Sequence, residues 1–193
     1  MILVLDTSSP AESVVATIED EALQEFRTRG FDRELIKRLV AERPPSKVAV
    51  AAGPGSFMGL RLGVSFGLGL AMGLRIPIVP LPTLALQAAR SRVAPVTAVV
   101  DAGRGRYYFQ PPDAPARLGE PVDIPTQHPL VGRVVHRESL LAAGHHFKPE
   151  EELVSFALAA NHVLEKAREV PYGRLEIEYM QSFSVPTKSE PSA

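Results

Sequence analysis

The sequence contains no cysteine and carries almost no net charge. Without cysteine, the 193-residue chain forms no disulfide and no thiolate metal site, which fits a reducing cytoplasm. A formal net charge of -1 gives no indication of the large basic surface that a protein needs to hold nucleic acid unaided. The five histidines include no HxxxH pair, the spacing that places two imidazoles on one helix face for a metal ion. We therefore expect no metal ligands.

The chain begins with MILVLD, an apolar run that ends in an aspartate and has no basic segment before it. This pattern predicts a β-strand over residues 2–5 and not a signal peptide. At 45% hydrophobic and 22% charged residues, the composition suits one or two compact domains.

The most informative stretch is AAGPGSFMGLRLGVSFGLGLAMGL, residues 51–74. Residues 53–56 (GPGS) predict a turn, and residues 59–74 predict a helix. Gly59, Gly63, Gly67 and Ala71 recur at every fourth position, so one edge of this helix is almost free of side chains. Glycine inside a helix costs about 1 kcal/mol relative to alanine, so a packing reason is required. Because the rest of the helix surface is also largely apolar, we expect a sheet on one side and a protein partner on the other.

Three other interpretations of this stretch remain. Small-xxx-small spacing also joins membrane helices, although Arg61 lies inside the segment and its flanks are typical of a turn and a strand. A glycine-rich turn before a helix also binds phosphate, but the Gly-Lys-Ser/Thr of the Walker pattern is missing. The third interpretation is burial inside a larger single domain.

The first 92 residues predict the order βββαβαβα, which implies a mixed sheet flanked by helices. The strands are expected at residues 2–5, 13–18, 22–28, 47–51 and 77–79, and the helices at residues 31–43, 59–74 and from Thr83, as cap, to 91.

A strand, an aspartate, a turn and a returning strand occur a second time. Residues 96–100 end at Asp101 as residues 2–5 end at Asp6, and a strand over residues 107–110 follows. This repetition predicts two related α/β lobes that face each other across a cleft. We place them at residues 1–92 and 93–185, the second being reduced, with a disordered composition over residues 186–193. In the second lobe we expect a strand at 131–135, helices at 137–143 and 150–168, and an edge strand or extended arm at 177–180.

Three segments together carry a resemblance to a known family. ILVLDTSSPAESVVA, VAVAAGPGSFMGLRLGVSFGLGLAMGLRIPIV and AVVDAGRGRYYF, in this order, resemble the TsaB (YeaZ) family, over about the first 110 residues. The resemblance implies two RNase H-like lobes of the actin, sugar-kinase and Hsp70 ATPase superfamily.

The resemblance also implies a function. The chain is expected to be a non-catalytic, cytoplasmic partner subunit of the TsaD/TsaE machinery. That machinery makes threonylcarbamoyladenosine beside the anticodon of tRNAs that read codons beginning with A. ATP and magnesium then belong to the partner subunits, and tRNA is met indirectly. The family forms homodimers, or heterodimers with TsaD, through its first two helices. Carried over, the interface comprises Leu35, Leu39, Gly59, Leu60, Gly63, Val64, Gly67, Leu68 and Ala71.

The superfamily binds nucleotide between its lobes, which implies a vestigial nucleotide cleft here. Its residues are expected to be Asp6, Thr7, Ser8, Gly53, Gly55 and Asp101. The alternative function is a free-standing nucleotide-dependent enzyme with Asp6 and Asp101 as its carboxylates, and a metallopeptidase-like activity ranks below it. Thr7 and Ser8 stand where a phosphate-binding glycine is needed, so capping of the turn is the favoured role for Asp6. Arg104 and Arg106, beside Tyr107 and Tyr108, are candidates for RNA contact.

Overall fold

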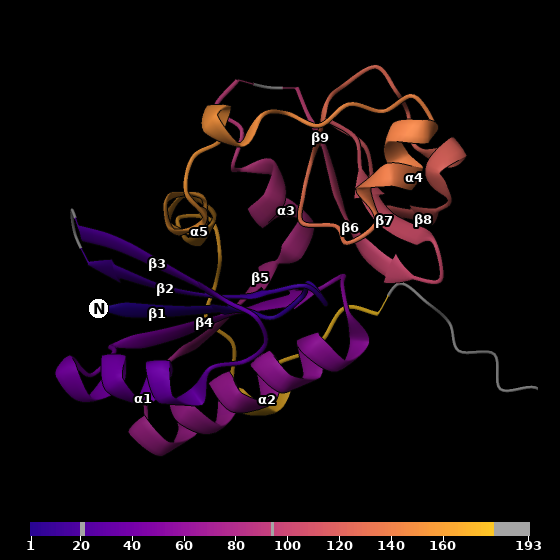
Figure 1. The fold of residues 1–193 in the computed structure, drawn as a ribbon. Coiled ribbons are helices and arrows are strands. Elements are labelled where there is room, and N and C mark those ends of the chain that lie inside the picture. The colour runs from indigo at the N-terminus through magenta and orange to yellow at the C-terminus, as the bar shows by residue number, and fades with distance from the viewer. Residues whose placement is uncertain (20–21, 94, 180–193) are drawn as a thin grey trace, which may run out of the picture.

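The computed structural model describes residues 1–19, 22–93 and 95–179, whose strands form two mixed sheets (Figure 1). The first sheet has the order β3-β2-β1-β4-β5, and the second has the order β8-β7-β6-β9. The strands of the first sheet are β1 (Ile2–Asp6), β2 (Ser13–Glu19), β3 (Ala22–Thr28), β4 (Lys47–Gly53) and β5 (Ile78–Pro82). Those of the second are β6 (Thr97–Gly103), β7 (Arg106–Gln110), β8 (Arg117–Gly119) and β9 (Leu130–Val131).

The two sheets share one pairing pattern. β1 pairs antiparallel with β2 and parallel with β4, and β6 likewise pairs antiparallel with β7 and parallel with β9. Asp6 and Asp101 therefore occupy matching places near the ends of β1 and β6. The α/β class and the element order predicted for the first 92 residues are confirmed.

Helices cover both faces of the first sheet (Figure 1). α1 (Arg33–Glu42) and α2 (Phe57–Leu74) lie on one face, where they pack on Leu3, Leu5 and Val50. α5 (Phe156–Leu164) lies on the other face, where Phe156 packs with Val4. Successive residues of β1 thus point to opposite faces, as the pleat of a strand requires. α3 (Thr83–Ala88) lies between the two sheets, and α4 (Arg137–Ala142) covers the second.

The long helix predicted over residues 150–168 is wrong. Its first part is a 3₁₀ turn, η2 (Glu150–Glu152), and the α-helix begins only after Ser155, whose Oγ accepts a hydrogen bond from the N–H of Leu158 at 3.2 Å. Between them, the N–H of Val154 donates to the carbonyl of Arg90 at 2.8 Å. A residue whose backbone pairs with a distant segment cannot also continue a helix, so this tertiary contact overrides the helical periodicity.

Two smaller predictions are also corrected, and one of the two alternatives given for residues 177–180 is observed. Thr83 is the first residue of α3 and not its cap; Pro82 holds the cap position, and α3 ends at Ala88. The strand predicted over 131–135 is the two-residue β9, which is followed by a bend at Gly132. Residues 177–179 form an extended arm without strand pairing, which bonds the first sheet through the N–H of Glu178 and the carbonyl of Ala52 at 2.8 Å. Residue 180 and the tail predicted at 186–193 lie outside the described residues.

After residue 153, the chain returns to the first sheet although these residues follow the second sheet in sequence. α5 packs on the first sheet, and the N–H of Val170 bonds the carbonyl of Ile78 at 3.1 Å. The division at residue 92 therefore describes the sequence and stays a prediction as a domain boundary.

Candidate functional site

Helix α2 begins at a built turn. The Oγ of Ser56 accepts a hydrogen bond from the N–H of Gly59 at 3.3 Å, which caps the helix. The N–H of Ser56 donates to the carbonyl of Ser8 at 2.7 Å, so the turn before α2 is bonded to the turn after β1. Gly55 lies against the same residue, since a Cβ at this position would approach Ser8 closer than 3.0 Å.

The glycine edge of α2 faces the chain's own first sheet. A Cβ added to Gly59 or Gly63 would collide with Thr7, and one added to Gly67 would collide with the side chain of Val50. The Oγ1 of Thr7 donates a hydrogen bond to the carbonyl of Gly59 at 2.7 Å, which holds the helix at this distance. We call the line Gly59, Gly63, Gly67 and Ala71 the inner edge.

The expectation that this edge meets a partner is therefore wrong for its glycines. Gly63, Gly67 and Ala71 are buried within the chain, as are Leu60 and Val64. Of the other predicted interface residues, Leu35 and Leu39 are buried in the core beneath α1, and Gly59 and Leu68 are half-buried. Spacing of small residues indicates that a backbone comes close, but it does not say which backbone.

The opposite side of α2 carries a second line of small residues, which the sequence reasoning missed. Ser65, Gly69 and Gly73 are exposed and also recur at every fourth position. Among residues 1–19, 22–93 and 95–179, no atom of another segment would lie within 4 Å of a Cβ at Gly69 or Gly73. Large apolar side chains flank them and are exposed in the chain alone: Met58 72%, Leu62 47%, Met72 53% and Leu74 39%. We call this set the outer edge.

No contact within the described chain explains the outer edge. Each of its two glycines costs the helix stability and relieves no close approach to the sheet. Next to it, the ring of Phe31, just before α1, meets that of Phe66 edge-on at 4.9 Å, so α1 and α2 form one layer. Among the described helices, α2 is the one long and apolar enough to cross a membrane, but its inner edge is built into the first sheet.

Asp6 is fully buried and engaged on both carboxylate oxygens. Its Oδ1 accepts a hydrogen bond from the N–H of Ser8 at 2.8 Å, which confirms the predicted turn-capping role. Its Oδ2 pairs with the guanidinium of Arg133, which comes from the segment after β9 in the second lobe. Arg133 also stacks over the ring of Phe156 at 5.5 Å. Its guanidinium thus lies against the carboxylate that a metal ion would need, and Asp6 does not offer a free ligand.

Asp101 holds the matching place in the second sheet but differs in its partner. Its Oδ2 accepts a hydrogen bond from the backbone N–H of Val135 at 2.8 Å, and no arginine pairs with it among the described residues. Burial raises the pKa of Asp101 above its ordinary value of 3.8, while the bond from Val135 opposes this rise.

The residues predicted for a nucleotide cleft separate into two places. Asp6, Thr7, Ser8 and Gly55 lie together beneath the start of α2. Asp101 instead lines a cavity of about 570 Å³ with Ser56, Phe57 and the turn at 103–105. Gly53 has φ +121° and lies against the backbone of Glu178, so the terminal arm covers it. The structure describes no group of three His, Asp or Glu side chains placed to hold a metal ion.

The two tyrosines of the candidate RNA contact are not available to stack on a base. Tyr107 and Tyr108 are buried, and the hydroxyl of Tyr107 donates to the carbonyl of His136 at 2.9 Å. No base can stack on these rings while the second sheet is intact. Arg61 contacts the terminal arm, where its Nε donates to the hydroxyl of Tyr179 at 3.1 Å.

Comparison with known proteins agrees with these elements. A family model described as "TsaD: tRNA N6-adenosine threonylcarbamoyltransferase" matches residues 33–168. The TsaB protein of Bacillus subtilis, named for tRNA threonylcarbamoyladenosine biosynthesis, is 31% identical over 120 residues, 55% of this chain and 52% of that protein. TsaB of Haemophilus influenzae is 28% identical over 122 residues, 56% of this chain and 52% of that protein. The matches thus span about half the length of these relatives.

Solved structures show the same fold. YeaZ from Pseudomonas aeruginosa superposes with a TM-score of 0.65 at 17% identity, covering 93% of this chain and 99% of that one. This agreement places the two sheets and their helices in the actin-like ATPase fold. The matched segment runs from α1 to beyond α5 and includes the glycine-rich helix, Asp101 and Arg133. The chain therefore belongs to the TsaD family and, within it, to the TsaB (YeaZ) group.

Proposed function

We propose that this chain is a non-catalytic subunit of the machinery that places a threonylcarbamoyl group on the adenosine beside the tRNA anticodon. The names of its relatives support the pathway. The outer edge of α2 supports the role, because it is a surface that no other described residue covers. In this proposal the protein is cytoplasmic, tRNA is met through the complex, and ATP and magnesium are held by the partner subunits.

The proposed partner is TsaD, or a second copy of the chain, docked on the α1 and α2 layer; TsaE joins the assembly. Two helices pack at 8–10 Å between axes, and small residues permit the closest approach. Ser65, Gly69 and Gly73 provide such a line, and Met58, Leu62 and Met72 provide apolar side chains on either side of it. Burial of these exposed side chains is the expected source of affinity.

The test is association measured with the full chain and TsaD from the same cells. Leu62→Asp and Met72→Asp place a charge in the proposed interface, and each is expected to weaken association at least about tenfold. Val122→Asp is the matched control. Val122 is 81% exposed and follows β8 in the sequence, many residues away from α2. Analytical ultracentrifugation of the chain alone distinguishes a homodimer, and unchanged assembly in both variants would reject this surface.

A cellular readout tests the pathway independently. A strain lacking the chain should contain less threonylcarbamoyladenosine in its tRNA, measured by mass spectrometry of nucleosides. The wild-type chain and Val122→Asp should restore the modified nucleoside, and Leu62→Asp should not. A normal level in the deleted strain would reject the function even if the interface were correct.

The rival hypothesis is a nucleotide-dependent enzyme that uses Asp6 and Asp101. The pairing of Asp6 with Arg133 weighs against it, because that carboxylate is already neutralised. Calorimetry with ATP and magnesium tests the rival directly. Tight binding that is lost in Asp101→Asn would overturn the ranking.

A further inference from the structure

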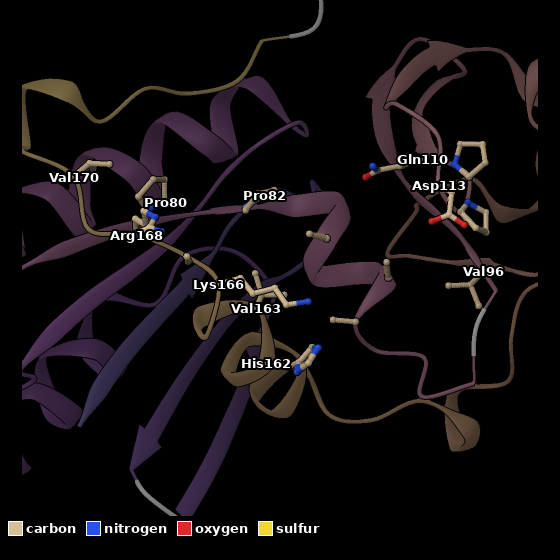
Figure 2. A pocket seen from close by; sticks show the side chains of 16 residues that line it. Pro80, Pro82, Val96, Gln110, Asp113, His162, Val163, Lys166, Arg168 and Val170 are labelled. Atoms are coloured by element: carbon tan, nitrogen blue, oxygen red, sulfur yellow. The ribbon is translucent and has the colours of Figure 1, made fainter.

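A second cavity lies between the lobes, away from α2. Its volume is about 730 Å³, within the range of pockets that hold small molecules. Its apolar walls are formed by Pro80 and Pro82 of the first sheet, Ala85 of α3, Ala89 just after α3, and Pro111 after β7. Figure 2 shows the segment after α5 on one side and Gln110 and Asp113 on the other. Both lobes thus contribute to one pocket.

The charged groups of this pocket are unevenly distributed. Lys166, Arg168 and His162 come from the end of α5 and the residues after it, and Asp113 lies on the opposite wall. His162 has a partner, since its Nδ1 lies 3.5 Å from Glu165. Within the described residues, neither Lys166 nor Arg168 makes an ion pair. In Figure 2 the amine of Lys166 points into the space between α5 and α3.

We propose that this cavity binds a small organic anion: an apolar body with a carboxylate or phosphate head. Alanine and proline walls take up the body without polar partners, and the unpaired amine of Lys166 meets the head. Asp113 repels an anion weakly from the far wall. The inference does not depend on the proposed partner, because no outer-edge residue lines this cavity.

Three probes with one apolar body test the claim on the full chain: 2-naphthoate, 2-naphthyl phosphate and 2-naphthylmethylammonium. Because the chain has no tryptophan, naphthalene fluorescence reports binding without an indole background. We expect both anions to bind and the ammonium compound to bind at least about tenfold more weakly. The ratio of the two anions shows whether the head that fits is a carboxylate or a phosphate.

Substitutions assign the binding to this cavity. Lys166→Gln should weaken naphthoate binding roughly three- to fivefold, and Asp113→Asn should strengthen it. Ala85→Phe fills the pocket and should abolish binding in a chain whose circular dichroism is unchanged. Lys37→Gln is the control, since Lys37 lies on α1 and pairs with Glu34 at 2.8 Å. It should leave the affinity unchanged.

Three results would overturn the proposal. One is the absence of binding of any probe at millimolar concentration. Another is equal affinity for the ammonium compound and the anions, which would show that charge plays no part. The third is a set of amide shifts, in NMR spectra with naphthoate, that follows Leu62 and Met72 and not Ala85 and Val163.

Discussion

The inner and outer edges of α2 look alike in sequence and differ completely in environment. Both are lines of small residues at every fourth position, one ending in Gly67 and Ala71 and the other in Gly69 and Gly73. Along the inner edge, each glycine lies where a Cβ would collide with Thr7 or Val50. Along the outer edge, a Cβ at Gly69 or Gly73 would have no atom of another described segment within 4 Å. One side of the helix thus packs on the first sheet, and the described residues leave the other side exposed.

A line of small residues on a helix indicates close packing but does not identify the neighbouring segment. Glycine is costly in a helix, so its recurrence indicates a close approach of another backbone. The identity of that backbone depends on which side of the helix the sheet covers. The inner edge explains why α2 packs so close to β1 and β4, and the outer edge is the surface at which we propose a partner.

The largest effect is expected from loosening the turn beneath the inner edge. Arg133→Met removes the partner of buried Asp6 and leaves a carboxylate without a cation, which typically costs about 3–5 kcal/mol of unfolding free energy. Denaturant unfolding measures the loss. The double variant Asp6→Asn, Arg133→Met should recover part of it, because no charge is then left unpaired.

Arg29 is exposed, so Arg29→Met is the control. If Arg133→Met lowered the unfolding free energy no more than Arg29→Met does, the predicted cost of the unpaired carboxylate would be contradicted. That result would mean that the pair between Asp6 and Arg133 does not hold the two lobes together. The inner edge would then be maintained by the hydrogen bonds of Thr7 and Ser56 and by packing on Val50.

The next effect is expected at Gly59. In Gly59→Ala the new methyl group would collide with the carbonyl oxygen of Thr7, which is backbone and cannot rotate away. Overpacking of this kind costs about 1–3 kcal/mol, measured as a fall in the midpoint of denaturant unfolding. For the same reason, Gly67→Leu should damage the fold itself. Gly67→Leu is therefore unsuited as a test of partner binding. If Gly59→Ala left the stability of the chain unchanged, the assignment of the inner edge would be refuted.

The same substitution on the other side should act in the opposite direction. Gly69→Ala adds a methyl group in open space and raises helix propensity, so the isolated chain should gain about 0.5–1 kcal/mol. Thermal unfolding of the isolated chain measures the gain. If Gly69 meets a partner helix closely, the same variant should weaken association, and a variant that is more stable but binds equally well would argue against close packing there.

The smallest effect extends the comparison to the second sheet, where Asp101 stands in the place of Asp6. Burial raises its pKa above 3.8, so the native chain holds this proton more tightly than the unfolded chain. The contribution of Asp101 to stability therefore falls as pH rises from about 3.8 through the raised pKa.

Asp101→Asn should then raise stability at neutral pH while an amide oxygen still accepts the bond from Val135. The difference from the wild type should shrink below about pH 3.8, where both side chains are neutral. Unfolding curves across this range give the measurement. A difference independent of pH would show that ionised Asp101 carries no burial cost.

Much of the local structure could be predicted from the sequence alone. Runs such as residues 2–5 and 47–51 form strands because they are short and apolar and are bounded by turn residues. The repeated strand and aspartate at Asp6 and Asp101 correctly indicated two sheets with one pairing pattern. The helix in the glycine-rich stretch could also be predicted from the sequence. So could the turn-capping role of Asp6, because capping depends on neighbours a few residues away.

Distant contacts were not predictable in this way. Arg133 lies 127 residues from Asp6, and nothing in its surroundings marks it as the partner of that carboxylate. The break before Ser155 depends on a backbone bond to Arg90, and the interlobe cavity depends on where α5 returns to the first sheet.

Local residue patterns specified most strands and helices of the first 92 residues and the presence of a helix with bare backbone, because these features follow from the character of neighbouring residues. The tertiary structure decided which edge of that helix faces the sheet. It also decided that Asp6 faces an arginine and that a cavity lies between the lobes. These features arise where segments far apart in the chain meet. The spacing of residues within one segment does not indicate which distant segment will contact it.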